Sequence, residues 1–173
     1  MDERYLMIML RLVHIFGGVF WVGSVAALAW FIYPAQPVLG ESSGKFMQEL
    51  MLKQKLGNWI GGAMILTVLS GATMYIRLSM VSHGVFASSR TGMLLGFGAV
   101  MAIVAAGIGG GVASRTAPKM VKLGEEIRAS GAPPTEAQRA EFARLQARHA
   151  WSLRTAGSLL VITVAAMAIA RYM

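Results

Sequence analysis

The chain has 173 residues, of which 55% are hydrophobic and only 14% charged, and its mean hydropathy is +0.57. Because a soluble domain carries about 25% charged residues, this composition argues against a soluble domain and favours a membrane protein. The net charge of +8 comes from basic residues that flank apolar segments, so it predicts contact with lipid headgroups and no nucleic-acid partner. The absence of cysteine excludes disulfides, thiolate metal sites and iron–sulfur clusters.

Four stretches reach the roughly 20 apolar residues that a helix needs to cross a bilayer. They cover residues 5–33, 58–80, 91–113 and 149–172. The first contains a sequence like a signal-peptide cleavage site at Ala27 to Ala29, but its apolar run is too long for a signal peptide, so we expect a true span. The expected fold class is all-α, with residues 1–173 forming one membrane domain, a compact up-down bundle of four transmembrane helices.

The connection between the first two spans begins with two prolines in the stretch PAQP, which should end the first helix. Phe46, Met47, Leu50 and Met51 then recur at helical spacing. This pattern predicts a short amphipathic helix at the cytoplasmic surface of the membrane.

The connection between the third and fourth spans is the longest. Pro118 suits the first position of a new helix, and the stretch SGAPP should end it. Thr135 and Gln138 form a capping-box pattern that predicts a second helix, which could continue directly into the fourth span. We expect a cytoplasmic helical hairpin, which either only sets the topology, the interpretation we favour, or serves as a docking surface.

The distribution of Lys and Arg predicts the orientation of the chain. Eleven of the sixteen lie in or beside the two longer connections. These are Lys45, Lys53, Lys55, Arg115, Lys119, Lys122, Arg128, Arg139, Arg144, Arg148 and Arg154. By the positive-inside rule both connections should be cytoplasmic and both termini periplasmic, in the inner membrane of a bacterium.

Small residues predict how the spans associate, because helices in lipid are held together by close packing and not by the hydrophobic effect. The third span has two small-xxx-small pairs, and the second span has two adjacent glycines near its start. We therefore assign helix packing to Gly92, Gly96, Gly107, Gly111, Gly61 and Gly62.

His14 is the first candidate for chemistry, because an ionisable residue inside a span suggests a function. Gly18 and Trp21 follow at helical spacing on the same face, and Gly18 would leave room beside the imidazole for a flat ligand or a neighbouring helix. His149 lies at the other end of the bundle, roughly 24 Å away along the helix axis, so the two cannot hold one haem together. We favour a structural role, with the imidazole bonded to a carbonyl or hydroxyl on a neighbouring helix.

Methionine is the second candidate, with 13 in the chain. Thioether and imidazole ligands together would select Cu(I). The residues of such a site would be His14, Met7, Met74, Met80 and Met93. Methionine is also a common filler of apolar helices, which is the simpler explanation. All eight acidic residues lie outside the spans and the sequence lacks an HExxH, GxSxG or P-loop motif, so we expect no enzymatic activity and no proton-coupled transport.

The stretch LRLVHIFGGVFWVG resembles the first helix of small four-helix bacterial membrane proteins of the copper-resistance-D-like group. The residues that carry the resemblance are His14, Trp21 and Gly23. The pairing of the stretch KFMQELMLKQKLGNWIGGAMILTVLSG with the ending MAIARYM is also similar to uncharacterised members of that group. The resemblance implies handling of haem or copper.

We expect a non-catalytic accessory or structural subunit of a larger membrane complex, for example a photosynthetic or respiratory electron-transfer complex. Its partners would be the lipid bilayer and other membrane proteins, and it would hold no cofactor. The alternative is a b-type haem or copper protein in which His14 is a ligand.

Overall fold

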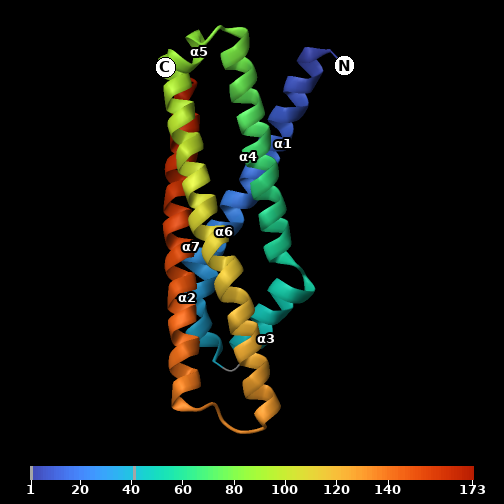
Figure 1. Cartoon of the computed structure of the whole chain (residues 1–173), viewed down its shortest axis with the longest axis vertical. Coiled ribbons are helices and arrows are strands. Elements are labelled where there is room, and N and C mark those ends of the chain that lie inside the picture. Colours follow the sequence, from blue (N-terminus) through green and yellow to red (C-terminus); the bar gives the residue numbers. More distant parts are fainter. Residues whose placement is uncertain (1, 41) are drawn as a thin grey trace.

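The computed structural model describes residues 2–40 and 42–173; Met1 and Glu41 lie outside the described residues. It is built of helices, and four helical runs are long and apolar enough to cross a membrane: Glu3–Leu39, Leu56–Val81, Arg90–Ser130 and Glu136–Ala170. The all-helical class and the four apolar helices are therefore confirmed, and they indicate a multi-pass membrane protein. The runs alternate in direction, so that both ends of the chain lie at the same end of the molecule (Figure 1).

The first run begins with α1, Glu3–Ala27, whose N-cap Asp2 accepts a hydrogen bond from the backbone of Arg4. It continues through a π-helical turn, η1 (Leu28–Ile32), the short α2 (Tyr33–Ala35) and a 3₁₀ turn, η2 (Gln36–Leu39). The run extends beyond the predicted end at residue 33, because Pro34 occupies an early position of α2, where its missing N–H costs little.

The first connection contains helical turns. It consists of α3, Ser42–Gln48, and a π-helical turn, η3 (Glu49–Lys53). Leu50 and Met51 pack against the buried core. Lys55, in a left-handed conformation with φ of 53°, then starts α4, Leu56–Val81. The short α5, Val85–Ser88, joins α4 to α6 at the end of the molecule where the termini lie (Figure 1).

The structure corrects the prediction that a new helix starts at Pro118. Helix α6 runs without a break from Arg90 to Ser130, with Pro118 inside it. An interior proline removes one helical hydrogen bond, but the adjacent turn is held by tertiary packing, since Thr116 is buried and bonds to His149 of α7. Helix α7, Glu136–Ala170, has the predicted capping box at Thr135 and Gln138 and continues directly into the fourth apolar stretch, as expected.

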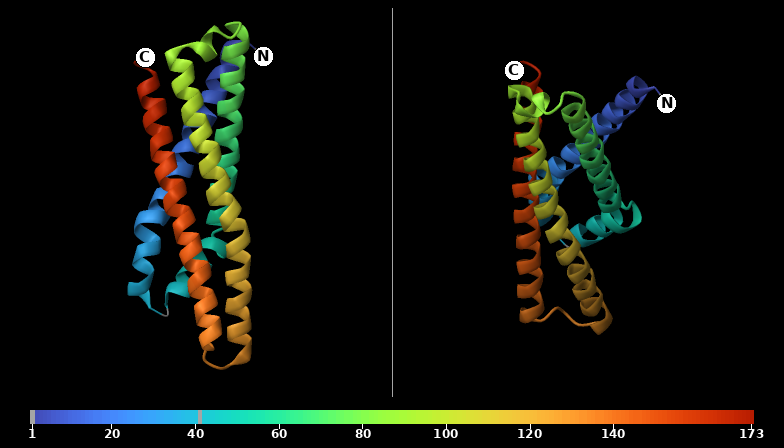
Figure 2. Two further views of the ribbon diagram at one scale, coloured as in Figure 1. Left: turned by 60° about the vertical axis from the view of Figure 1, so that its left-hand side comes forward. Right: turned by 45° about the horizontal axis from the view of Figure 1, so that its top comes forward.

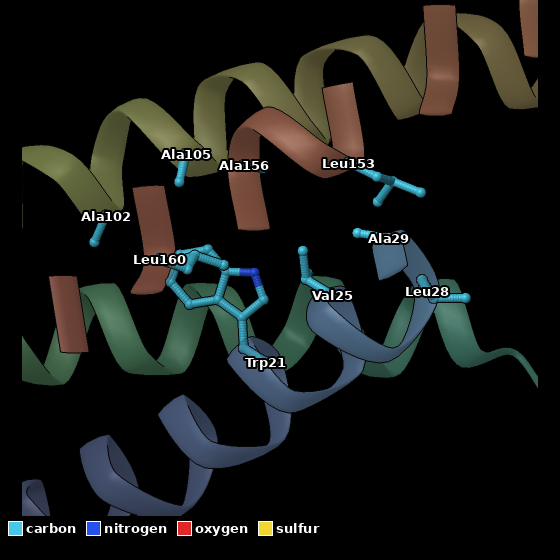
Figure 3. Packing of buried hydrophobic residues seen from close by; sticks show 9 residues of the cluster. All are labelled: Trp21, Val25, Leu28, Ala29, Ala102, Ala105, Leu153, Ala156 and Leu160. Atoms are coloured by element: carbon cyan, nitrogen blue, oxygen red, sulfur yellow. The ribbon is translucent and has the colours of Figure 1, made fainter. Parts of the chain in front are cut away.

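The helices form two pairs rather than one compact bundle. Helices α6 and α7 lie side by side and α1 packs mainly on α4, while the N-terminal part of α1 diverges from α6 and α7 toward the end that holds the termini (Figure 2). Helix α4 stays beside α6 at that end, where α5 joins the two helices and Gly96 lies against Tyr75. Helix α1 crosses between the pairs, and its C-terminal half reaches α7. The core at this crossing contains Trp21, Val25, Leu28, Ala29, Ala102, Ala105, Leu153, Ala156 and Leu160 (Figure 3). Its many alanines let the helix backbones approach closely, which is how helices associate in lipid.

Candidate functional site

His14 is held between α1 and α4. Its Nδ1 lies 2.8 Å from the carbonyl oxygen of Thr67, the kind of bond that a structural role predicts. A carbonyl oxygen only accepts, so Nδ1 must carry the proton and donate. In the neutral ring this leaves Nε2 with a free lone pair. The same bond that orients the imidazole therefore leaves it in the tautomer that binds a metal through Nε2.

Gly71 of α4 provides the space for this ring. A Cβ placed on Gly71 would lie 2.7 Å from Cε1 and 2.9 Å from Nδ1 of His14. Any side chain there would push the imidazole aside. Gly18 leaves room for the neighbouring helix α4, one of the two alternatives expected from the sequence: its nearest neighbour is the methyl group of Thr67, 3.6 Å from the position of a Cβ. The role of Gly71 could not be predicted from the sequence, because nothing local in the sequence shows which helix faces His14.

The polar side chains of α4 beside His14 are satisfied within their own helix. The hydroxyl of Thr67 donates to the carbonyl of Ala63 at 2.7 Å, and that of Ser70 donates to the carbonyl of Leu66 at 2.6 Å. In residues 2–40 and 42–173, every buried side-chain nitrogen and oxygen has a hydrogen-bond partner. The buried polar side-chain atoms at the contact between α1 and α4 are thus all hydrogen-bonded to groups of the described chain.

Trp21 does not share a pocket with His14. Its side chain is 4% exposed and lies beside Leu160 of α7 in the core, which also includes Ala105 of α6 (Figure 3). Helix α1 crosses from one helix pair to the other, so His14 meets α4 while Trp21 meets α6 and α7. The residues predicted as one cofactor site, His14, Gly18 and Trp21, therefore lie in two different contacts.

The other two histidines are too far from His14 to share a haem with it. His149 stacks near the ring of Tyr33, with the ring centres 5.3 Å apart, and Tyr33 lies roughly 28 Å beyond His14 along the first helical run. His83 lies beyond the end of α4, and that end is already roughly 15 Å along the helix from Gly71. His14 thus fits a single ligand position, and the chain does not fit a bis-histidine site.

The methionines predicted as copper ligands are spread along the helices. Met80 and Met93 point outward, at 72% and 57% exposed. Met7 lies roughly 10 Å from His14 along α1, and Met74 is one turn from Gly71. Among the described residues, no group of three or more His, Cys, Asp or Glu is placed to hold a metal ion. Of the four methionines, the positions along the helices bring only Met74 to the level of His14.

The glycines assigned to helix packing divide into two groups. Gly92 and Gly96 have close neighbours. Gly92 lies against the backbone of Phe86 in α5, and a Cβ on Gly96 would lie 3.2 Å from the hydroxyl of Tyr75 in α4. At the other four, a Cβ added to the glycine would have no neighbouring atom within 4 Å in the described part of the chain. These are Gly61, Gly62, Gly107 and Gly111. Contacts with α7 are made instead by Gly98 and Gly109.

A second polar cluster, missed by the sequence analysis, lies where α2, α6 and α7 meet. The Oγ1 of Thr116 is 2.8 Å from Nδ1 of His149, and both residues are buried. One turn away, the amide of Gln146 donates to the side-chain oxygen of Gln36 at 2.7 Å. Phe142, Leu145 and His149 share a helix face, which is the only local signal that His149 points inward.

A basic cavity of about 210 Å³ opens beside this cluster, between α6 and α7. Its lining residues are Arg115, Thr116, Lys119, Arg144, Leu145 and Arg148. Glu141 accepts two hydrogen bonds from Arg144, at 2.8 and 2.9 Å, and this interaction lowers the pKa of the Glu141 carboxyl. Among the described residues no carboxylate lies within 4.0 Å of the charged nitrogens of Arg115, Lys119 or Arg148.

Comparisons with protein-family models, with curated proteins and with solved structures found no match to this chain. The resemblance to copper-resistance-D-like proteins therefore rests on His14, Trp21 and Gly23 and on the similar stretches of sequence described above.

Proposed function

We propose that this chain is a non-catalytic accessory subunit of a larger assembly in a bacterial inner membrane. The observation that supports the proposal is the set of four glycines with open space around them: Gly61, Gly62, Gly107 and Gly111. In lipid, helix association depends on small residues that let backbones approach. Glycine is also the least favourable helix former after proline. We therefore explain these four glycines, whose Cβ positions have no neighbour within 4 Å in the described part of the chain, by a helix from another protein.

The open glycines of α4, Gly61 and Gly62, lie close to those of α6, Gly107 and Gly111. Met64 of α4 contacts Gly110 of α6, with its Cε 3.9 Å from the position of a Cβ. Gly61 is about one turn from Met64, and Gly107 and Gly111 flank Gly110. A partner helix lying along this seam would touch small residues on both α4 and α6. In this proposal both long connections are cytoplasmic and both termini periplasmic, as the distribution of Lys and Arg predicts.

The test is size and copurification after gentle solubilisation. The native protein should elute as a complex with other membrane proteins, and the Gly107→Leu/Gly111→Leu variant should elute as the isolated chain. Gly23→Leu is the matched control, since Gly23 also has open space but is not part of the seam. Elution of the native protein as an isolated monomer, or equal loss of the complex in both variants, would contradict the proposal.

A second function is supported by the tautomer of His14. With Nδ1 donating to the Thr67 carbonyl, Nε2 is free to serve as a ligand to haem iron or Cu(I). His14 would hold the metal, and a further ligand would have to come from outside the histidines of this chain. When bound, such a metal would supply one-electron chemistry.

An absorption spectrum of the protein purified in mild detergent tests this second function. A haem protein would show a Soret band that His14→Ala abolishes and that Thr67→Val leaves in place, because the Thr67 backbone carbonyl is retained. The copper content per chain is measured by metal analysis of the same sample. A spectrum without a Soret band, together with less than one copper per chain, would argue against it.

A further inference from the structure

The structure assigns a phosphate-binding site to the basic cavity between α6 and α7, for the phosphate group of an anionic lipid or of a soluble phosphorylated ligand. The residues that line the cavity include neither the seam glycines nor His14, so this inference does not rest on the proposed function. It rests on the arrangement of the four cations, on their charge balance and on their depth in the membrane.

The four cations are arranged as two facing pairs. Arg115 and Lys119 are one turn apart on α6, and Arg144 and Arg148 are one turn apart on α7. Residues four apart lie on the same helix face, so each helix presents two cations to the same cavity. Between them lie Thr116 and Leu145, which are 2% and 5% exposed.

The charge balance of the cavity favours an anion. Arg144 is paired with Glu141, which leaves three of the four cations without a carboxylate within salt-bridge distance among the described residues. Like charges that line one cavity repel one another, and an anion placed between them offsets that repulsion. Phosphate matches the forked donors of Arg and binds Lys as a point charge, so it suits this mixture.

The depth of the cavity places it at the level of lipid headgroups. Arg115 and Arg148 lie just outside the predicted apolar spans 91–113 and 149–172. Trp151, about one turn further along α7, is 60% exposed, as expected for an aromatic residue at the membrane interface. Basic pockets between membrane helices on the cytoplasmic side bind anionic headgroups.

The test measures the binding of two probes to the full chain in detergent. Phosphatidylglycerol, with phosphatidylcholine as reference, is titrated by native mass spectrometry, and sodium phosphate is titrated by calorimetry at constant ionic strength. The double variant Arg115→Gln/Arg148→Gln should weaken the binding of the probe that occupies the site about thirtyfold. The control variant Lys122→Gln/Arg128→Gln also removes two positive charges, both from the part of α6 outside the cavity. It should change the binding of either probe by less than about threefold.

Loss in the phosphatidylglycerol titration identifies a lipid headgroup as the ligand, and loss confined to the sodium phosphate titration identifies a soluble phosphate. If the double variant fails to fold, as judged by circular dichroism, Lys119→Gln replaces it. Lys119 is exposed, and its loss should weaken binding about fivefold. Equal binding by the cavity variant and the native protein in both titrations, or equal loss in the control, would overturn the site.

Discussion

The hydroxyl of Thr116 and the ring of His149 are joined by a buried hydrogen bond of 2.8 Å that links α6 to α7. The bond lies two residues before Pro118, where the helical hydrogen-bond pattern of α6 is interrupted. At this turn, the hydrogen bond to α7 thus compensates for the helical hydrogen bond that Pro118 cannot make. Four measurable consequences follow from this and the other contacts.

Thr116→Val keeps the shape of the side chain but leaves Nδ1 of His149 without its partner. An unsatisfied buried polar group costs about 1–3 kcal/mol, so we expect the free energy of unfolding to fall by that amount. Thermal unfolding in detergent micelles measures it. Thr73→Val is the control, because Thr73 bonds only to the Leu69 carbonyl of its own helix at an exposed position. Equal stability of the two variants would show that the link between the helices contributes nothing.

Gly71→Ala should destabilise the contact between α1 and α4. The added methyl group would lie 2.7 Å from the imidazole of His14, and such overpacking costs about 1–3 kcal/mol. Gly23→Ala should have the opposite sign, a gain of up to about 1 kcal/mol, because Gly23 has open space and alanine is the better helix former. Comparison of the two unfolding curves checks both signs, and a stabilised Gly71→Ala would mean that His14 is free to move.

Leu160→Ala should be among the most destabilising core substitutions. Leu160 is 1% exposed and packs in the cluster that contains Trp21 and Ala105. Removal of a buried leucine side chain costs about 2–5 kcal/mol. Leu66→Ala removes the same atoms from a side chain that is 55% exposed, and we expect it to change the free energy of unfolding by less than about 1 kcal/mol. A similar loss in both variants would contradict the core at the crossing of α1 and α7.

Glu141 should titrate below its ordinary pKa of 4.5, because Arg144 donates two hydrogen bonds to its ionised form. A lowered pKa in the folded state means that this pair stabilises the protein above the ordinary pKa, and that the contribution is lost as the pH falls through the folded-state value. The NMR shift of the Glu141 carboxyl carbon follows the titration. Arg144→Gln should bring the pKa back toward 4.5; an unchanged pKa would rule out Arg144 as the cause.

The features that depend on local residues could be predicted from the sequence. Apolar runs long enough to cross a bilayer identified four helices, and Thr135 with Gln138 identified the start of α7, because hydropathy and capping are decided by residues close together in the chain. The prediction of a helix start at Pro118 was wrong for the complementary reason. A local rule for proline was overridden by packing against a distant helix.

The sequence by itself therefore determined that this chain forms long apolar helices, roughly where they begin and end, and which residues lie on each helix face. Only the tertiary structure decided what each face meets: His14 against Thr67 and Gly71, Trp21 against Leu160, and four cations around one cavity. The physical reason is that the rotation and crossing of helices depend on how side chains from different helices fit together, and no single helix contains that information.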